Sequence, residues 1–331
     1  NYYTIPVYYF SDNQNMKLFS LTVDFAFKAL FAPNPDLLMD LLNSFPSFQG
    51  SNRIKNLKVL NPEIPKEISD EKLSILDLRA ENENGENFLI EMQAFPQSNF
   101  SKRALYYWSK VYSRGLGKGR KYNELKKVYS INFVKYPLWK EHSECISTFQ
   151  LLEKDRNFPL TDDLEIHIVE LSKFLKSIEN LRSNLDTWFY LLKEASNLKG
   201  ESMKTLEKKN PAVKRAISEL KTLSLTARNR ELYEARRKAE LDYASGMDDA
   251  FNEGLEKGIE KGIEKGIEKG IEKGIEGFYL GIQLNLEARF NLKDDSIMKQ
   301  IRKSKDIEKL KKILIQSAKA KTFAEFKKSL K

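Results

Sequence analysis

The sequence predicts an α/β (α+β) fold, in which strands and helices share one core and a helical C-terminal region follows. Between residues 54 and 171, short apolar runs with strand-like alternation are separated by polar turns and by one longer helical pattern. From about residue 178 onward the apolar spacing is helical, and this region contains a tandem Gly-Ile-Glu-Lys repeat. We therefore expect a sheet-containing core followed by helices.

Composition supports a soluble protein with a polyanionic partner. The chain has 331 residues, 41% of them apolar, and a net charge of +9. From Lys299 to the end it holds twelve Lys and Arg residues against three acidic ones, so the basic excess lies in the tail. No apolar run approaches the roughly 18 residues of a membrane span. No signal peptide is recognisable, and the single cysteine, Cys145, fits a cytoplasmic protein without membrane partners.

The first elements are two short helices and a strand. Thr22 or Asp24 can cap a helix with apolar residues at helical spacing, which ends before Pro33. Asp36 to Phe45 predicts a second helix with its leucines turned inward. A polar connection leads to Ile54–Leu60, which we expect to form a strand.

A β-hairpin follows, in which Asn84-Gly85 separates two apolar runs. Asp77 lies within the first run and Glu91 within the second. Charged groups in apolar strands are costly unless a partner compensates them. A divalent cation would compensate both carboxylates at once.

The hairpin register decides whether the two carboxylates can meet. A two-residue turn would set Asp77 opposite Met92 and direct the acids to opposite faces of the sheet. A three-residue loop, Glu83 to Gly85 with Gly85 in the left-handed conformation, sets Asp77 opposite Glu91 instead. Gln93 then shares their face. We expect the three-residue loop, because only this register gives the acids a common partner.

Several motifs around the hairpin resemble one known family. They are D-F-A-F-K at 24–28, L-L-N at 41–43, L-S-I-L-D-L-R-A at 73–80, I-E-M-Q at 90–93, F-S-K-R-A-L-Y-Y at 100–107 and V-E-L-S-K-F at 169–174. Together with the repeat they are similar to the PD-(D/E)xK nuclease family transposases, which include the recombination-promoting nucleases. The resemblance runs from about Leu18 to the repeat.

This resemblance implies a restriction-endonuclease-like mixed sheet core flanked by helices, over residues 18–175. It also implies a metal-dependent endonuclease that hydrolyses DNA with Mg²⁺, or alternatively Mn²⁺. The implied metal ligands are Asp77, Glu91 and Asp24, and Gln93 completes the catalytic set. Asp24 has the alternative or additional role of a helix N-cap.

Two positions depart from the family pattern. Gln93 stands where the family usually has a lysine, and Leu76 stands where it has the name-giving proline. Lys28, one turn after Asp24, could supply the missing charge or remain a surface cation. Arg103 could contact the scissile phosphate. These departures leave open a second function, a catalytically weak DNA-binding or protein-interaction module on the same fold.

A helix is predicted from near Ser98, and a glycine-rich basic loop follows it at 115–122. The loop cations Lys118, Arg120 and Lys121 could bind phosphate, or the segment could be a flexible turn. Walker spacing is missing, so we expect no nucleotide cofactor.

Two further strands are predicted, at Lys127–Tyr136 and Leu164–Leu171. His167 lies in the second strand and is expected to be structural. With only two histidines in the chain, a histidine-rich metal site is excluded.

The remaining chain divides into a helical extension at 176–245, the repeat region at 246–277 and a basic amphipathic helical tail at 278–331. Each glycine in a helix costs about 1 kcal/mol relative to alanine, so the isolated repeat would be marginally stable. We expect the repeat at 254–277 to pair with a second copy and form a homodimer. The alternative is a flexible spacer of variable length.

Overall fold

The computed structural model describes residues 17–64, 74–96, 99–117, 119–291 and 295–330. The chain forms two compact units, Asn1–Ala244 and Ser245–Lys331. The predicted N-terminal segment at 1–17 lies outside the described residues except for Lys17. The finer domain boundaries stay predictions.

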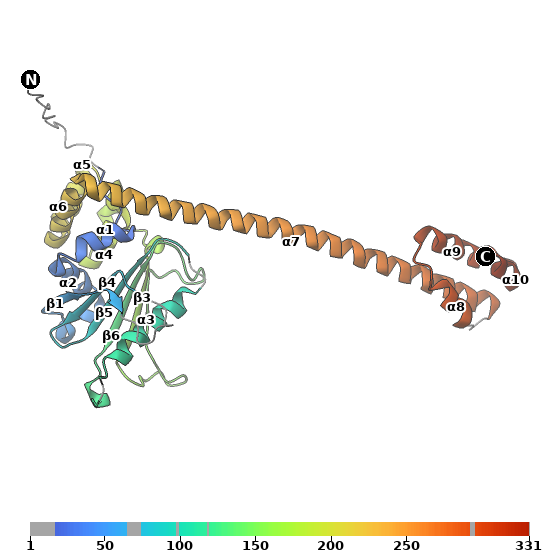
Figure 1. The fold of residues 1–331 in the computed structure, drawn as a ribbon, viewed down its shortest axis with the longest axis horizontal. Helices are drawn as coiled ribbons and strands as arrows, with labels where there is room; N and C mark the ends of the chain where they lie inside the picture. The colour runs from blue at the N-terminus through green and yellow to red at the C-terminus, as the bar shows by residue number, and fades with distance from the viewer. Residues whose placement is uncertain (1–16, 65–73, 97–98, 118, 292–294, 331) are drawn as a thin grey trace, which may run out of the picture. The chain divides into compact units, whose positions relative to one another are not determined.

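The first unit is built on a six-stranded mixed sheet with the order β1-β4-β5-β6-β8-β7 (Figure 1). The strands are β1 Leu57–Leu60, β4 Leu78–Asn82, β5 Asn87–Gln93, β6 Val128–Val134, β7 Ile146–Phe149 and β8 Leu164–Glu170. Strands β5, β6 and β8 are parallel, whereas β1, β4 and β7 pair antiparallel with their neighbours. The predicted α/β class with a mixed sheet is therefore confirmed.

Helices cover both faces of this sheet (Figure 1). On one face, apolar residues of β4, β5 and β6 share a core with α1 Asp24–Phe31, α2 Pro35–Asn43, α4 Asn184–Glu194, α5 Gly200–Lys209 and α6 Pro211–Leu225. On the other face, Leu89 and Val128 pack against Val111 of α3 Phe100–Arg114. Glu91 shares this face of the sheet, because it lies two residues after Leu89 along β5.

The predicted elements agree with the structure to within about three residues at most of their ends, and the exceptions are informative. The hairpin is interrupted, because β3 Ser74–Ile75 pairs with β2 Glu63–Ile64 in a separate two-stranded sheet. The edge strand β7 was not predicted. The predicted cap of the first helix is wrong: its N-cap residue is Val23, and the helix has no side-chain capping bond.

The second unit is helical. Helix α7, Ala227–Phe290, begins in the first unit and contains the entire repeat, which belongs to the second unit. It is followed by α8 Asp295–Ile301, α9 Ile307–Lys319 and α10 Phe323–Lys328. The expected amphipathic tail packs on itself and on the end of α7, with Ile282, Leu310 and Phe326 fully buried. No helix among the described residues combines the length and apolar character needed to cross a membrane.

Candidate active site

The loop between β4 and β5 has the three-residue form. Leu78 pairs with Ile90 and Glu81 with Asn87, and continuing this register by one residue sets Asp77 opposite Glu91. The hairpin closes with a hydrogen bond from Asn82 N to Glu86 O of 3.1 Å. Gly85 has a φ of +78°, a conformation that glycine adopts without steric cost. The predicted register is confirmed.

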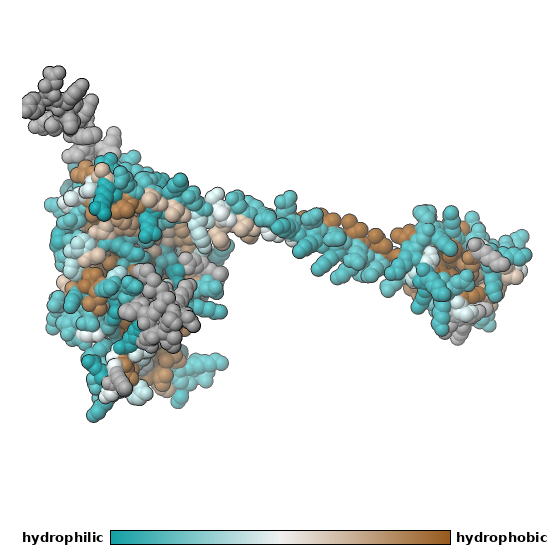
Figure 2. Space-filling model, viewed as in Figure 1, coloured by the Kyte–Doolittle hydropathy of each residue, from teal (hydrophilic) through white to brown (hydrophobic). Residues whose placement is uncertain are grey.

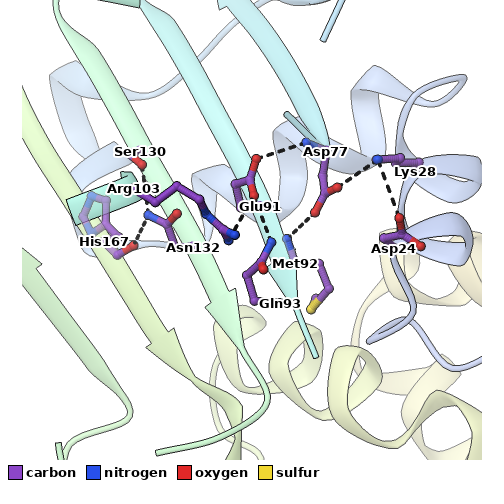
Figure 3. Close-up of polar contacts among 10 residues, drawn as sticks. All are labelled: Asp24, Lys28, Asp77, Glu91, Met92, Gln93, Arg103, Ser130, Asn132 and His167. Carbon is purple, nitrogen blue, oxygen red and sulfur yellow. Dashed lines mark hydrogen bonds and ion pairs between the residues drawn. The ribbon is translucent and has the colours of Figure 1, made fainter. Parts of the chain in front are cut away.

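This register brings the Asp77 and Glu91 side chains together (Figure 3). The Asp77 backbone N–H donates to Glu91 Oε1 at 3.3 Å, and the Met92 backbone N–H donates to Asp77 Oδ2 at 2.7 Å. These carboxylates accept backbone hydrogen bonds that a regular ladder would give to carbonyls. The prediction that Asp77 lies inside the strand is therefore wrong, because β4 begins only at Leu78.

Helix α1 supplies a cation to the first carboxylate. Lys28 Nζ lies 2.9 Å from Asp77 Oδ1 and 3.8 Å from Asp24 Oδ2. Asp24 and Lys28 share one face of α1 because they are four residues apart. Figure 3 shows the Lys28 ammonium between the two aspartates, so Asp24 reaches the site on the far side of this cation from Asp77.

Helix α3 supplies a second cation to the other carboxylate. Arg103 Nη2 lies 3.8 Å from Glu91 Oε2, and the guanidinium lies over the rings of Phe100 and Tyr107. Gln93, at the end of β5, donates from Nε2 to the same Glu91 oxygen at 2.9 Å. The side chain at this position therefore contacts Glu91 without bringing a positive charge.

Burial sets the proton affinity of the two acids. Asp77 is 8% exposed and Glu91 6% exposed. Burial and the charge of Asp77 raise the pKa of Glu91 to about 8. Burial also raises the pKa of Asp77, although Lys28 opposes this increase. A site that makes two neighbouring carboxylates hard to ionise favours a bound cation.

The residues fit a divalent cation through this acid pair. The donors are carboxylate oxygens, which hard cations such as Mg²⁺ prefer, and ion binding would relieve the mutual repulsion of Asp77 and Glu91. No three Asp, Glu, His or Cys side chains converge as ligands within the part of the chain that the structure describes. Asp24 would complete such a set only if Lys28 moved from between the two aspartates.

Two polar groups beside the acids were not predicted. Asn132 of β6 is paired with Glu91, is almost fully buried and donates to Ser130 Oγ at 2.9 Å. The sequence signal that could have identified Asn132 is the pair Ser130 and Asn132, two polar residues at alternate positions of an otherwise apolar strand. The second group is Tyr107 of α3, whose pKa is raised by burial and by the charge of Glu91.

The glycine-rich loop lies away from the acids. Arg120 and Lys121 are exposed, whereas Lys118 lies outside the described residues. The loop follows the C-terminal end of α3, and Arg114 comes eleven residues after Arg103, roughly 16 Å along the helix axis. The two described loop cations, Arg120 and Lys121, therefore do not belong to the acid site.

Comparison with family models matches residues 21–250 to the PD-(D/E)XK nuclease family transposases. This match covers more than half of the chain, including the whole sheet and the acid pair. No significant match was found among curated proteins or among solved structures.

Proposed function

The chain belongs to the PD-(D/E)XK nuclease family transposases, and we propose that it is a metal-dependent endonuclease that hydrolyses phosphodiester bonds of DNA. The observation that carries this proposal is the buried pair of Asp77 and Glu91 on neighbouring β-segments, with Lys28 and Arg103 beside it. Its biological role would be in recombination or in the movement of mobile elements, as the family description suggests.

Asp77 and Glu91, with Asp24, are the residues proposed to hold Mg²⁺ or Mn²⁺. A divalent cation bound there would polarise the phosphodiester and lower the pKa of an attacking water. Gln93 can orient that water through its amide but cannot neutralise charge. The carboxylates must lose their protons to bind the cation, so the raised pKa of Glu91 makes cation binding depend on pH.

Lys28 and Arg103 are proposed to replace the missing lysine. Both are within 4 Å of one of the acids, and neither is carried by the strand that bears the family lysine. A cation near the scissile phosphate stabilises the negative charge that develops during hydrolysis. Arg103 can also hold a phosphate through two parallel hydrogen bonds.

The test is nicking of supercoiled plasmid in Mg²⁺ by the wild type, Asp77→Ala and Glu91→Ala. Glu81→Ala is the matched control, since Glu81 is an acid of the same hairpin outside the pair. We expect both site variants to lose nicking and the control to keep it. Binding of Mn²⁺, measured by calorimetry without DNA, should be lost in parallel. Equal nicking by all four proteins would contradict the proposal.

A catalytically weak DNA-binding or interaction module is the second candidate. The specific observation is that Lys28 Nζ already pairs with Asp77 and that Gln93 lacks a charge, so the acids are partly compensated by the chain itself. This candidate predicts no nicking by any of the four proteins, together with DNA binding that survives in EDTA.

Arg120 and Lys121, together with Lys118, are proposed to contact the DNA backbone beyond the cleavage point. Both described cations are exposed, although Arg120 Nε lies 4.0 Å from Glu124 Oε2. Neutralising these cations should weaken DNA binding equally for all sequences and reduce its salt dependence.

We also propose that the protein acts in the cytoplasm, in line with its single cysteine.

The repeat is proposed to pair with a second copy of the chain. Its apolar residues Leu255, Ile259, Ile263, Ile267 and Ile271 are 46–59% exposed, and they form an apolar row along α7 (Figure 2). A Cβ added at any glycine from Gly254 to Gly277 would meet no atom within 4 Å. Because the row drifts by about 40° per four residues, paired helices would wind right-handedly.

The dimer is tested by light scattering of Ile263→Gln with Ile267→Gln. This pair keeps the charge and should halve the mass, because it removes two apolar contacts from the row. Leucine at the same two positions is the control and should keep the dimer. An unchanged mass in the glutamine variant would exclude pairing through this row.

A further inference from the structure

A cavity of about 960 Å³ lies in the first unit next to the start of α1, and no step proposed above uses it. Its walls come from residues 17–23, from Phe95 and Lys135 just after β5 and β6, and from the end of α6 and the first turns of α7. Val23, in the wall, directly precedes Asp24, so the cavity reaches the edge of the candidate active site.

The α7 wall of the cavity is held in place relative to α1. Tyr233 stacks on Phe19 with ring centroids 4.2 Å apart, and its hydroxyl accepts a hydrogen bond from Ser20 N at 3.0 Å. Further along α7, the Tyr243 ring lies 5.9 Å from the Phe95 ring. These contacts fix the first turns of α7 over the ends of β5 and β6.

The cavity carries a surplus of positive charge. Its lining includes the cations Lys17, Lys135, Arg230 and Arg237 and the acids Glu234 and Glu240. Spacings of three and four residues place Arg230, Arg237 and Glu240 on the same face of α7 as Tyr233. A concave surface with more cations than acids attracts an anionic ligand.

Two interactions connect the lining of the cavity with residues of the acid site. The backbone N–H of Lys135 donates to Gln93 O at 3.0 Å. This lining residue is therefore hydrogen-bonded to the residue whose side chain contacts Glu91. The lining residue Glu240, on α7, has its pKa raised to about 7 by burial and by the charge of Asp24. A polymer bound at the acids can therefore extend into the cavity.

The size and the lining of the cavity fit a nucleotide and exclude a duplex. Sites of 300–1,000 Å³ typically hold one molecule of roughly drug or nucleotide size. A DNA duplex, whose major groove alone is about 12 Å wide, does not enter such a cavity. Cations and aromatic rings in one lining, here Lys135 and Phe95, are typical of surfaces that bind single strands by phosphate contact and base stacking.

We propose that this cavity holds a single DNA strand next to the scissile phosphate, with a phosphate at Lys135 and Arg237 and a base against Phe95. Resting on the proposed nuclease function, this inference names its substrate class: DNA with a single-stranded segment beside the cleavage point, such as a flap or a branch. A fully paired duplex would use the acid site without filling the cavity.

The inference is tested by fluorescence anisotropy of the full-length protein with labelled DNA in EDTA, so that binding is measured without cleavage. The probes are a duplex and the same duplex with a single-stranded flap. The variant is Lys135→Gln with Arg237→Gln, and the control is Lys238→Gln, an exposed α7 cation outside the cavity lining. We expect the variant to lose about tenfold in affinity for the flap and to keep its affinity for the duplex.

The outcomes separate this inference from the proposed function. Equal losses on both probes, or no loss on either, would overturn the cavity assignment even if the plasmid is nicked. Selective loss on the flap would support it even if no nicking occurs. Displacement of the flap by a deoxynucleoside monophosphate at equal concentration would assign the cavity to a free nucleotide and overturn the strand proposal.

Discussion

The Glu91 carboxylate destabilises the metal-free fold when it is ionised, because it lies inside the sheet beside Asp77. Its pKa rises from about 4.5 in the unfolded chain to about 8 in the folded protein. The folded state therefore binds more protons than the unfolded state across this window. Stability consequently falls as pH rises from about 4.5 to about 8.

Replacing Glu91 by glutamine should remove this loss. At pH 8 in EDTA we expect Glu91→Gln to be more stable than the wild type by on the order of 2 kcal/mol, and at pH 5 the two should nearly coincide. Chemical denaturation at both pH values measures the difference. Glu144→Gln, at an exposed position, should follow the wild type at both pH values. Parallel pH profiles of Glu91→Gln and the wild type would contradict the assignment.

Lys28 is the residue on which activity should depend most after the two acids. Lys28→Met removes the ammonium that lies 2.9 Å from Asp77, and we expect the nicking rate to fall by roughly 10²-fold or more. Adding Gln93→Lys should restore part of the rate, because position 93 contacts Glu91. Single-turnover rates at saturating Mg²⁺ measure both steps. An unaffected Lys28→Met rate would assign the charge to Arg103 instead.

The acid pair could be predicted at the residue scale because its signal is local. Asp77 and Glu91 are charges within apolar runs, and one hairpin brings them together. Asn132, Tyr107 and Glu240 could not be placed in the same way. Their relation to the site depends on β6, α3 and α7, which approach it from distant parts of the sequence.

At the scale of elements, the hairpin register depends on Gly85. An alanine there would have ordinary contacts, since the nearest atom to its Cβ would be Lys126 Cγ at 3.7 Å. The cost would come from the φ of +78°, and we expect Gly85→Ala to destabilise the first unit by about 1 kcal/mol. Gly85→Asn should cost less, because asparagine tolerates this conformation. Denaturant midpoints compare the two variants, and equal costs would contradict the conformational explanation.

Elements with strong periodicity were predicted and the others were missed. The long runs of β5, β6 and β8 and the helix α3 have clear patterns and lie in the core. Strand β7 has four residues of intermediate or high exposure, so no alternation marks it. The interruption before β4 could not be predicted either, because the Asp77 and Glu91 side chains replace ladder acceptors.

At the scale of the whole molecule, each of the two compact units has an apolar core of its own, a division that the sequence did not reveal. The tail was predicted as an amphipathic helix, and its lysines dominate its composition. In the structure, Ile282 of α7 packs with the apolar faces of α9 and α10 in a core of the second unit. The sequence did not indicate this pairing. Amphipathic periodicity predicts that a helix has a partner, but it does not identify which element the partner is.

Separate cores predict separate unfolding of the two units. Phe326 is fully buried in the second unit. Phe326→Ala should lower the free energy of unfolding of this unit by about 3–5 kcal/mol, which is as much as the stability expected from such a small core. All three tryptophans lie before residue 245, so their fluorescence reports on the first unit alone, whereas circular dichroism reports on both. We expect Phe326→Ala to lose helical signal at 25 °C with an unchanged tryptophan transition.

Ile315→Ala provides the matched control, because this apolar residue of α9 is 42% exposed and its truncation removes less buried apolar surface. It should leave both signals close to those of the wild type. A tryptophan transition that shifts in Phe326→Ala would mean that the first unit draws stability from the second. Helix α7 would then transmit unfolding between the units. The variants tested for DNA binding and nicking would then have to be compared under conditions in which both units are equally stable in each variant.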